Sequence, residues 1–201
     1  MKGSKPNARA EQRRFLFLAD HLALDFVNTE VMEHGQRVDW LAAPGDLAVW
    51  LRQAGLASGV GATAARSLHL LRRAQGLRAA LRRMAGALAA ARRVPPSVIP
   101  VINRELRGAR SFQELARTGK GYEVLTRSEP GVAGMLTPIA QSAAELLASG
   151  DRLRVRRCGN PACILYFFDT TRSHTRRWCS MAGCGNRMKV AAHYRRRKTA
   201  D

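Results

Sequence analysis

Four cysteines are the residues of this chain with the clearest potential for chemistry. Four residues separate Cys158 from Cys163 and Cys179 from Cys184, and 15 residues lie between the two pairs. Two short loops that each supply two thiolates, joined by a connector of hairpin length, are typical of a closed tetrahedral zinc site. Four thiolates leave no open coordination position for a reacting molecule, so we predict a single, structural zinc ion.

Two disulfides or a redox centre are the alternatives for these cysteines. Disulfides are typical of secreted proteins, and residues 1–14 are charged and lack the apolar run of a signal peptide. Redox motifs keep two residues between their cysteines, whereas these pairs keep four. No segment has the roughly 20 apolar residues of a membrane span. We therefore expect a cytoplasmic zinc protein without a membrane partner.

The basic residues are concentrated around the cysteines. The chain has a formal charge of +19, and residues 152–201 contribute 13 Lys or Arg against two Asp. A basic surface held in shape by a metal is typical of nucleic-acid binding, and DNA is the expected partner. The candidate contact residues are Arg172, Arg176, Arg177, Arg187, Lys189, Arg195, Arg196 and Arg197.

A hairpin and a helix are expected to position the metal ligands and the basic residues. Residues 164–168 are β-branched and aromatic, polar turn residues follow, and residues 175–178 lead back to the second cysteine pair, which predicts a β-hairpin. Asn186 is the expected N-cap of a basic helix over 188–198.

The upstream part of the chain has the periodicity of helices. We expect helices over 15–29, 46–54, 62–93, 98–106 and 135–147, a hairpin formed by 109–117 and 122–127, and a strand at Leu153 and Val155. The longest helix has an apolar stripe at Leu70 or Leu71, Ala74, Leu77, Leu81, Met84 and Leu88. Its arginines fall mostly elsewhere and are expected to form a solvated face: Arg72, Arg73, Arg78, Arg82, Arg83, Arg92 and Arg93.

These elements predict a mainly α protein with a small β-hairpin. We expect a disordered basic arm over 1–14, a helical domain over 15–151, and a small treble-clef-like or ribbon-like zinc finger with four cysteine ligands over 152–201, which ends in a basic helix. Residues 59–61 contain two glycines and are expected to form a flexible joint.

Three polar residues stand among apolar neighbours near the start of the helical domain. Asp25, Asn28 and Thr29 either cap the helix and satisfy backbone groups where it ends, or line a pocket for a small ligand.

Two segments resemble known families. Cys184-Gly185-Asn186-Arg187, within its four-cysteine frame, resembles the CGNR zinc finger. The residues 24–29, Leu-Asp-Phe-Val-Asn-Thr, and the segment from Trp40 to Leu51 resemble the ABATE domain of bacterial proteins regarded as stress-induced transcription regulators. The resemblance implies zinc binding by the four cysteines, DNA binding, and regulation of transcription. A single small finger reads sequence weakly, so dimerisation through the helical domain is expected, as is a small-molecule effector.

Other functions remain as alternatives. RNA binding would use exposed aromatic side chains as a stacking surface, and the candidates are Tyr166, Phe167, Phe168, Trp178 and Tyr194. A zinc module that binds another protein is a further alternative. The chain has no nucleophile elbow, phosphate loop or dinucleotide fingerprint, so we do not expect an enzyme.

Overall fold

The computed structural model describes residues 15–56, 67–108, 110–119, 121–129 and 134–198. The expected basic arm over 1–14 and the expected joint over 59–61 lie outside these residues. In chain order the elements are α2 (Leu22–Val27), β1 (Glu30–Glu33), β2 (Gln36–Asp39), α3 (Pro44–Gln53), α4 (Leu68–Ala89), α5 (Val98–Leu106), β3 (Arg110–Thr118), β4 (Gly121–Glu129), α6 (Thr137–Ala148), the 3-10 helix η3 (Gly150–Arg154), β5 (Val155–Arg157), β6 (Tyr166–Phe168), the π-helix η4 (Met181–Gly185) and α7 (Asn186–Lys198).

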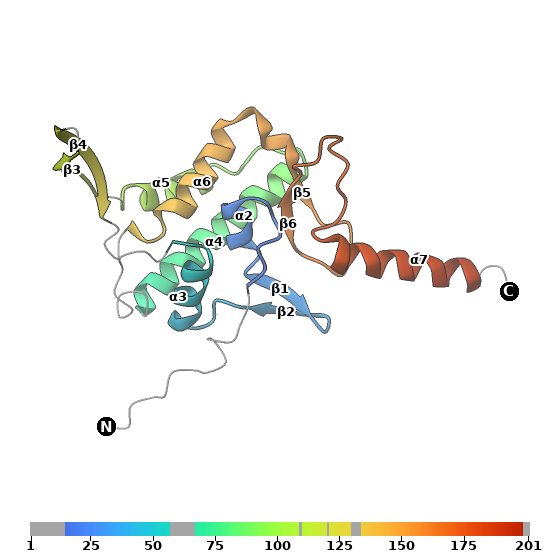
Figure 1. Ribbon diagram of the computed structural model, residues 1–201. Helices are drawn as coiled ribbons and strands as arrows, with labels where there is room; N and C mark the ends of the chain where they lie inside the picture. The colour runs from blue at the N-terminus through green and yellow to red at the C-terminus, as the bar shows by residue number, and fades with distance from the viewer. Residues whose placement is uncertain (1–14, 57–66, 109, 120, 130–133, 199–201) are drawn as a thin grey trace, which may run out of the picture.

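Helix α4 is the centre of the fold. Helices α2, α3 and α5 pack against it, and α6 packs against α2 and α5 (Figure 1). The helix begins after Ser67, whose hydroxyl accepts a hydrogen bond from the Leu70 amide. Its predicted apolar stripe is confirmed, because all of the following are buried: Leu70, Leu71, Ala74, Leu77, Leu81, Met84 and Leu88. One hydrophobic core therefore surrounds this helix.

Three antiparallel pairs of strands occur in the described part of the chain. The pair β3–β4 confirms the predicted hairpin and projects from the helices at one end of the molecule (Figure 1). The pair β1–β2 was not predicted from the sequence. Its turn places His34 and Gly35 in the left-handed region, with φ of 50° and 81°, and a histidine before glycine is not among the usual signals for such a turn.

The predicted helix over 15–29 is wrong in its first half. Only Leu22–Val27 is helical, and Asp20 has a left-handed φ of 53°. The Asp25 carboxylate accepts a hydrogen bond from the Ala19 amide at 2.9 Å, and the Phe15 amide donates to the Gln53 side chain. Side chains therefore take backbone donors that a longer helix would have used.

The arginines of α4 do not all form a solvated face, and this prediction is wrong for three of them. Arg78 is 4% exposed, and its guanidinium donates to both carboxylate oxygens of Asp39 at 2.5 and 2.6 Å. Arg82 pairs with Glu30 at 2.7 Å, and the third ion pair joins Arg73 and Glu105 at 2.5 Å. The carboxylates come from β1–β2 and α5. Arg72, Arg83, Arg92 and Arg93 are exposed, as expected.

The C-terminal segment packs directly on the helices. Strand β5 contacts α4, β6 contacts α2, and the Phe167 side chain of β6 is fully buried in the common core. The short helix η3 joins α6 to β5 without an extended linker. The division into domains at residues 151 and 152 stays a prediction. No helix in the described ranges combines the length and apolarity that a membrane crossing needs.

Candidate metal centre and basic surface

The four cysteines form one buried cluster. Their Sγ atoms all lie within 4.8 Å of one another, and the Sγ atoms of Cys163 and Cys179 are 3.9 Å apart. Tetrahedral zinc with Zn–S bonds of about 2.3 Å requires sulfur atoms about 3.8 Å apart. Each side chain is less than 9% exposed. The donor set and its spacing fit one structural zinc ion, held by Cys158, Cys163, Cys179 and Cys184.

Hydrogen bonds around the cluster are directed at sulfur. The Asn160 side chain donates to Cys184 Sγ at 3.3 Å, and the Cys179 amide donates to Cys158 Sγ at 3.4 Å. Donors of this kind favour the thiolate form that binds a metal. The sequence analysis did not predict that the Asn160 side chain would reach a sulfur.

The first cysteine loop also binds the segment that leads into Cys179. Gly159 donates its amide to the Arg177 carbonyl at 2.8 Å. A Cβ at Gly159 would stand 3.2 Å from that carbonyl oxygen and 3.2 Å from the Trp178 ring, so the close approach favours glycine.

Crowding shifts the pKa values of the thiols in opposite directions. Hydrogen bonds from Cys163 and Cys179 lower the pKa of Cys158 to about 2. The same hydrogen bond to Cys158 raises the pKa of Cys163 to about 12, and the pKa of Cys179 is also raised, first by its hydrogen bond to Cys158. Four sulfurs this close do not all ionise unless a cation balances them, and a bound zinc ion supplies that charge.

The strand that follows the first cysteine pair has a different partner from the one predicted. Strand β6 pairs with β5, with Val155 opposite Phe168 and Arg157 opposite Tyr166, and not with residues 175–178. The predicted hairpin between the cysteine pairs is therefore wrong in its partner. Leu153 lies in η3 and is 71% exposed, so the prediction that it begins the first strand is also wrong.

Asp169 organises the loop over 169–178 that leads to the second cysteine pair. Its fully buried carboxylate accepts hydrogen bonds from the amides of Thr171 and Arg176, each at 3.0 Å. Burial alone would raise its pKa, but the hydrogen bonds from Thr171 and Arg176 outweigh burial and lower the pKa of Asp169. The sequence analysis missed this residue. Asp169 could have been recognised from the sequence, because it is the only acidic residue between 152 and 200.

Arg176 is placed between the finger and the N-terminal segment. Its guanidinium pairs with Asp20 at 2.5 Å, donates to the Leu18 and Cys179 carbonyls at 2.7 Å, and lies 4.3 Å from the centre of the Phe167 ring. This candidate DNA contact therefore connects two parts of the fold.

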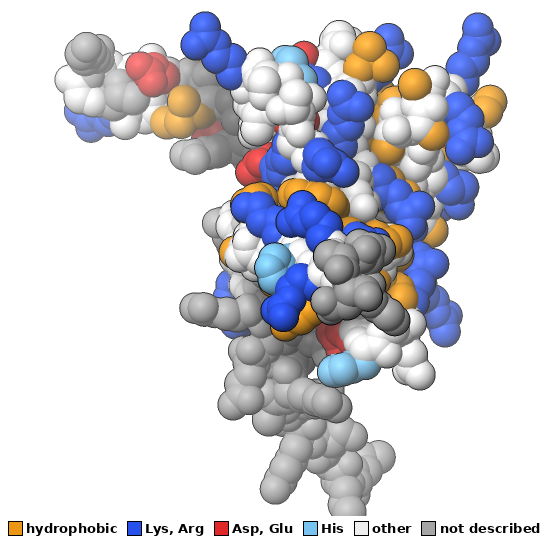
Figure 2. Space-filling model, turned by 90° about the vertical axis from the view of Figure 1, so that its right-hand side faces the viewer, with side chains coloured by type: hydrophobic (Ala, Val, Ile, Leu, Met, Phe, Trp, Pro, Cys, Tyr) orange, Lys and Arg blue, Asp and Glu red, His pale blue; other side chains and the backbone are white. Residues whose placement is uncertain are grey.

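The remaining candidate contact residues are exposed. Arg172 and Arg177 lie on the 169–178 loop, and Arg177 also covers the Trp178 ring at 5.1 Å. The other candidates lie on α7, which projects from the rest of the protein (Figure 1). They are Arg187, Lys189, Arg195, Arg196 and Arg197. Figure 2 shows the face from which α7 projects, where Lys and Arg side chains are widespread and acidic side chains are few.

The start of α7 corrects the predicted cap. Asn186 has helical angles, φ −64° and ψ −43°, because η4 precedes α7 without a break. The cap is Ser180, whose hydroxyl accepts the Gly183 amide at 3.2 Å. Cys184 therefore lies within the first turn of the continuous helix formed by η4 and α7, close to its positive end, where a thiolate is stabilised by the helix dipole.

The three polar residues near the N-terminus bind protein groups. Asn28 donates to the Tyr166 carbonyl at 2.8 Å and accepts the Tyr166 amide at 3.0 Å, so it joins α2 to the finger. Thr29 donates to the Phe26 carbonyl at 2.8 Å and accepts from Arg78. Desolvation raises the pKa of Asp25 to about 6. Two cavities, of about 590 and 530 Å³, are lined by other residues, and a ligand pocket at these three residues remains a prediction.

Two protein-family models match the chain. The ABATE model, described as "putative stress-induced transcription regulator", matches residues 20–150, and the CGNR zinc finger model matches residues 154–197. No curated protein matches the sequence.

Proposed function

Because this chain belongs to the ABATE family and carries a CGNR zinc finger, we propose that it is a zinc-dependent DNA-binding regulator of transcription whose finger contacts the DNA. The observation that carries the proposal is the basic helix that projects from the metal site. Helix α7 has six Lys or Arg among its 13 residues and no acidic residue. The families matched are a regulator family and a zinc finger family rather than enzyme families.

Helix α7 is anchored at one end only. Its main packing contact is with η4, next to Cys184. An isolated helix of 13 residues is marginal in water, and its polar surface offers little to a protein core. The major groove of duplex DNA is about 12 Å wide and accepts an α-helix. A nucleic acid would therefore supply both a surface on which α7 can pack and negative charge to balance its basic residues.

Most contacts of this helix are expected to involve phosphates. Arg195, Arg196 and Arg197 are consecutive, and successive helical residues point about 100° apart, so these three cannot all face one groove. Phosphate contacts give affinity rather than sequence preference. Arg187 lies in the first turn of α7 and is the candidate for a guanine edge, while Arg172 and Arg177 supply a second set of cations from the loop.

The aromatic side chains favour a duplex over single-stranded RNA. Phe167 is fully buried, and Tyr166, Phe168 and Trp178 are half-buried against the rest of the finger and the helices. Among these candidate stacking residues only Tyr194 is exposed, at 67%. A single exposed ring does not form the row of stacking positions that single strands use.

The helical part is proposed to sense a ligand or to dimerise. A single small finger is too limited to specify an operator, which favours two copies on DNA. The β3–β4 hairpin supports pairing of chains, because it projects from the fold and exposes Leu115, Tyr122 and Val124 by 63% or more. Zinc-binding thiolates need a reducing compartment, so we propose the cytoplasm as the site of action.

The triple variant Arg195→Ala, Arg196→Ala, Arg197→Ala tests the proposal in the full chain. Fluorescence anisotropy with a duplex at several salt concentrations should show weaker binding. The slope of log K against log salt should become shallower by about 0.9 for each phosphate that the variant no longer neutralises, or up to about 2.7.

A matched control removes three positive charges at positions outside the finger. Arg72, Arg83 and Arg92 are exposed, at or near α4, and their triple alanine variant should keep the affinity and the salt slope. Equal losses in both variants, or no loss in the α7 variant, would remove α7 from the contact surface.

A further inference from the structure

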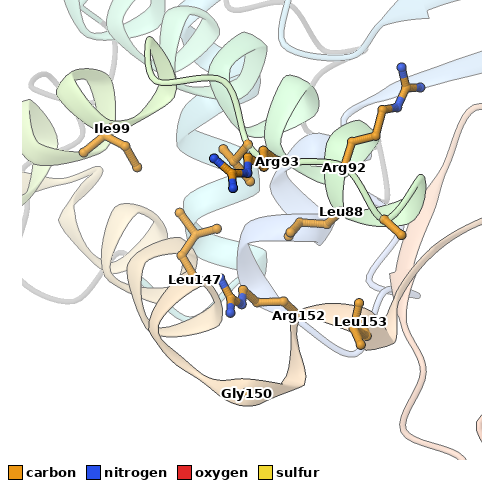
Figure 3. A pocket seen from close by; sticks show the side chains of 10 residues that line it. Leu88, Arg92, Arg93, Ile99, Leu147, Gly150, Arg152 and Leu153 are labelled. Carbon is orange, nitrogen blue, oxygen red and sulfur yellow. The ribbon is translucent and has the colours of Figure 1, made fainter.

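A cavity of about 590 Å³ lies where the C-terminal ends of α4 and α6 approach α5 and η3 (Figure 3). Its walls are largely apolar and come from these four elements, with Leu88 on α4, Ile99 on α5, Leu147 on α6 and Leu153 on η3. Ile99 is 44% exposed and Leu153 is 71% exposed, which are high values for large apolar residues that face a common hollow.

Two arginines enter this hollow. Figure 3 shows the side chains of Arg93 and Arg152 extending into the space beside Leu147, whereas Arg92 points away from it. Neither Arg93 nor Arg152 has an acidic partner among the described residues. The neighbouring Asp151 pairs instead with Arg154, at 3.6 Å. Two guanidinium groups that share an apolar-walled space repel each other, and an anion between them removes that repulsion.

The backbone holds Arg93 in this position. Just after helix α4, Ala91 lies in the left-handed region, at φ 51°, and the Arg92 amide closes the turn by donating to the Ala87 carbonyl at 2.8 Å. The chain therefore leaves the helix sharply, so that the residues after Ala91 form one wall of the cavity. Arg152 lies on the opposite wall, in the short helix η3.

We propose that this cavity binds an organic acid with an apolar body, such as a medium-chain carboxylate. The carboxylate would accept hydrogen bonds from Arg93 and Arg152, and the chain would lie against Leu88, Ile99 and Leu147. The volume falls within the range of small-molecule sites, roughly 300–1,000 Å³.

The position of the cavity offers a route to the metal site. Arg152 and Leu153 belong to η3, which continues directly into β5, and Cys158 follows β5. A bound acid would therefore contact the segment by which the chain enters the finger. Its role as the sensed ligand rests on the proposed function, whereas binding itself does not.

The test is isothermal titration of octanoate into the zinc-loaded full chain without DNA. Octanol, which has the chain without the charge, and acetate, which has the charge without the chain, are the comparison ligands. Octanoate should bind at one site, and roughly tenfold or more tightly than either, because only octanoate uses both the arginines and the apolar wall. No saturable binding of octanoate, or equal binding of octanol, would overturn the proposal.

Variants then locate the site. Arg93→Gln with Arg152→Gln should weaken octanoate binding roughly tenfold or more, and Arg83→Gln, at an exposed position of α4 that does not line the cavity, is the matched control that should leave it unchanged. Unchanged binding in the double variant would overturn the assignment. Zinc content and circular dichroism verify that each variant is folded, and the octanoate–octanol comparison on the unaltered chain decides the matter if one is not. Because DNA is absent, failure here leaves the proposed DNA binding to be judged by its own experiment.

Discussion

The arginines of helix α4 and those of helix α7 differ in their surroundings. In α4, Arg73, Arg78 and Arg82 turn inward and pair with carboxylates of α5, β1 and β2. In α7, Arg187 and Arg195 lie on the exposed surface of a helix that has no acidic residue. Both helices are rich in arginine, and three of the arginines of α4 form ion pairs with carboxylates from other elements of the described chain.

This difference indicates that an arginine of this protein is structural where the fold places an acidic residue beside it. Residues 1–151 contain 13 of the 15 acidic residues, and several of these neutralise α4. After residue 151, Asp169 is the only acidic residue described, and its carboxylate is bound by Thr171 and the Arg176 backbone rather than by a guanidinium. The C-terminal segment therefore keeps a net positive charge, which attracts a polyanion.

Removing the metal should have the largest effect, because zinc holds the exposed set of arginines in place. Cys184→Ser should abolish stoichiometric zinc and unfold the finger, since structural zinc contributes about 10–16 kcal/mol in small finger peptides. The finger shares a core with α2 and α4, so the thermal unfolding temperature of the whole chain should also fall. Zinc analysis and near-ultraviolet circular dichroism measure both effects.

Ser173→Ala, on the exposed part of the 169–178 loop, is the control for the cysteine variant and should keep one zinc ion per chain. Retention of one zinc ion and of native circular dichroism in Cys184→Ser would refute the ligand assignment.

Replacing Arg78 tests the contribution of the buried arginines of α4 to stability. Arg78→Ala removes the guanidinium that donates to the carboxylate of Asp39 and to the hydroxyl of Thr29, and breaking such a pair costs about 3 kcal/mol. We take the lower end of the range because the Asp39 side chain is 37% exposed. Urea unfolding measures the loss, and DNA affinity of the folded protein should not change.

Arg72→Ala is the matched control on the same helix, because Arg72 is exposed. Its unfolding free energy should stay within about 0.5 kcal/mol of the unaltered chain. Similar losses in the two variants would mean that burial and pairing do not distinguish these arginines.

The last comparison concerns two carboxylates, Asp39 and Asp25, whose pKa values shift in opposite directions. Burial would raise the pKa of Asp39, but its hydrogen bonds and charge interaction with Arg78 lower it, whereas burial raises the pKa of Asp25 to about 6. The pKa of Asp25 in the folded state lies above its unfolded value of 3.8. At a pH between these two values, Asp25 is therefore protonated in the folded state and ionised in the unfolded state. The contribution of Asp25 to stability is thus full below about pH 4 and is lost as the pH rises through about 6.

Asp25→Asn should remove this dependence. The unaltered chain should lose up to about 3 kcal/mol relative to the variant between pH 4 and pH 7. Comparing the urea midpoints of both proteins at each pH cancels the loss of zinc that both share in acid. A difference that does not change with pH would show that Asp25 keeps its ordinary pKa.

Sequence reasoning worked where the determinants are local. Cysteine spacing predicted the metal cluster, the helix over 98–106 was predicted where α5 lies, and the period of the apolar residues predicted the buried stripe of α4. Each of these signals depends on residues close together in the chain.

It failed where the partner comes from far away in the chain. Asn28 binds the backbone of Tyr166 across 138 residues, and Arg78 meets Asp39 across 39 residues. The strand over 166–168 had a good β pattern, but nothing in that pattern specified whether its partner preceded or followed it. Pairing of arginines with distant carboxylates depends on tertiary structure in the same way.

The dependence of the basic surface on zinc is measured most directly by DNA binding of one preparation before chelation, after chelation, and after one equivalent of zinc is returned. Anisotropy with a labelled duplex at fixed salt should show affinity that is lost without zinc and restored with it, because only the metal holds the loop and α7 as one basic surface. Metal-free protein that binds with the same affinity and the same salt slope would show that the basic surface does not depend on zinc.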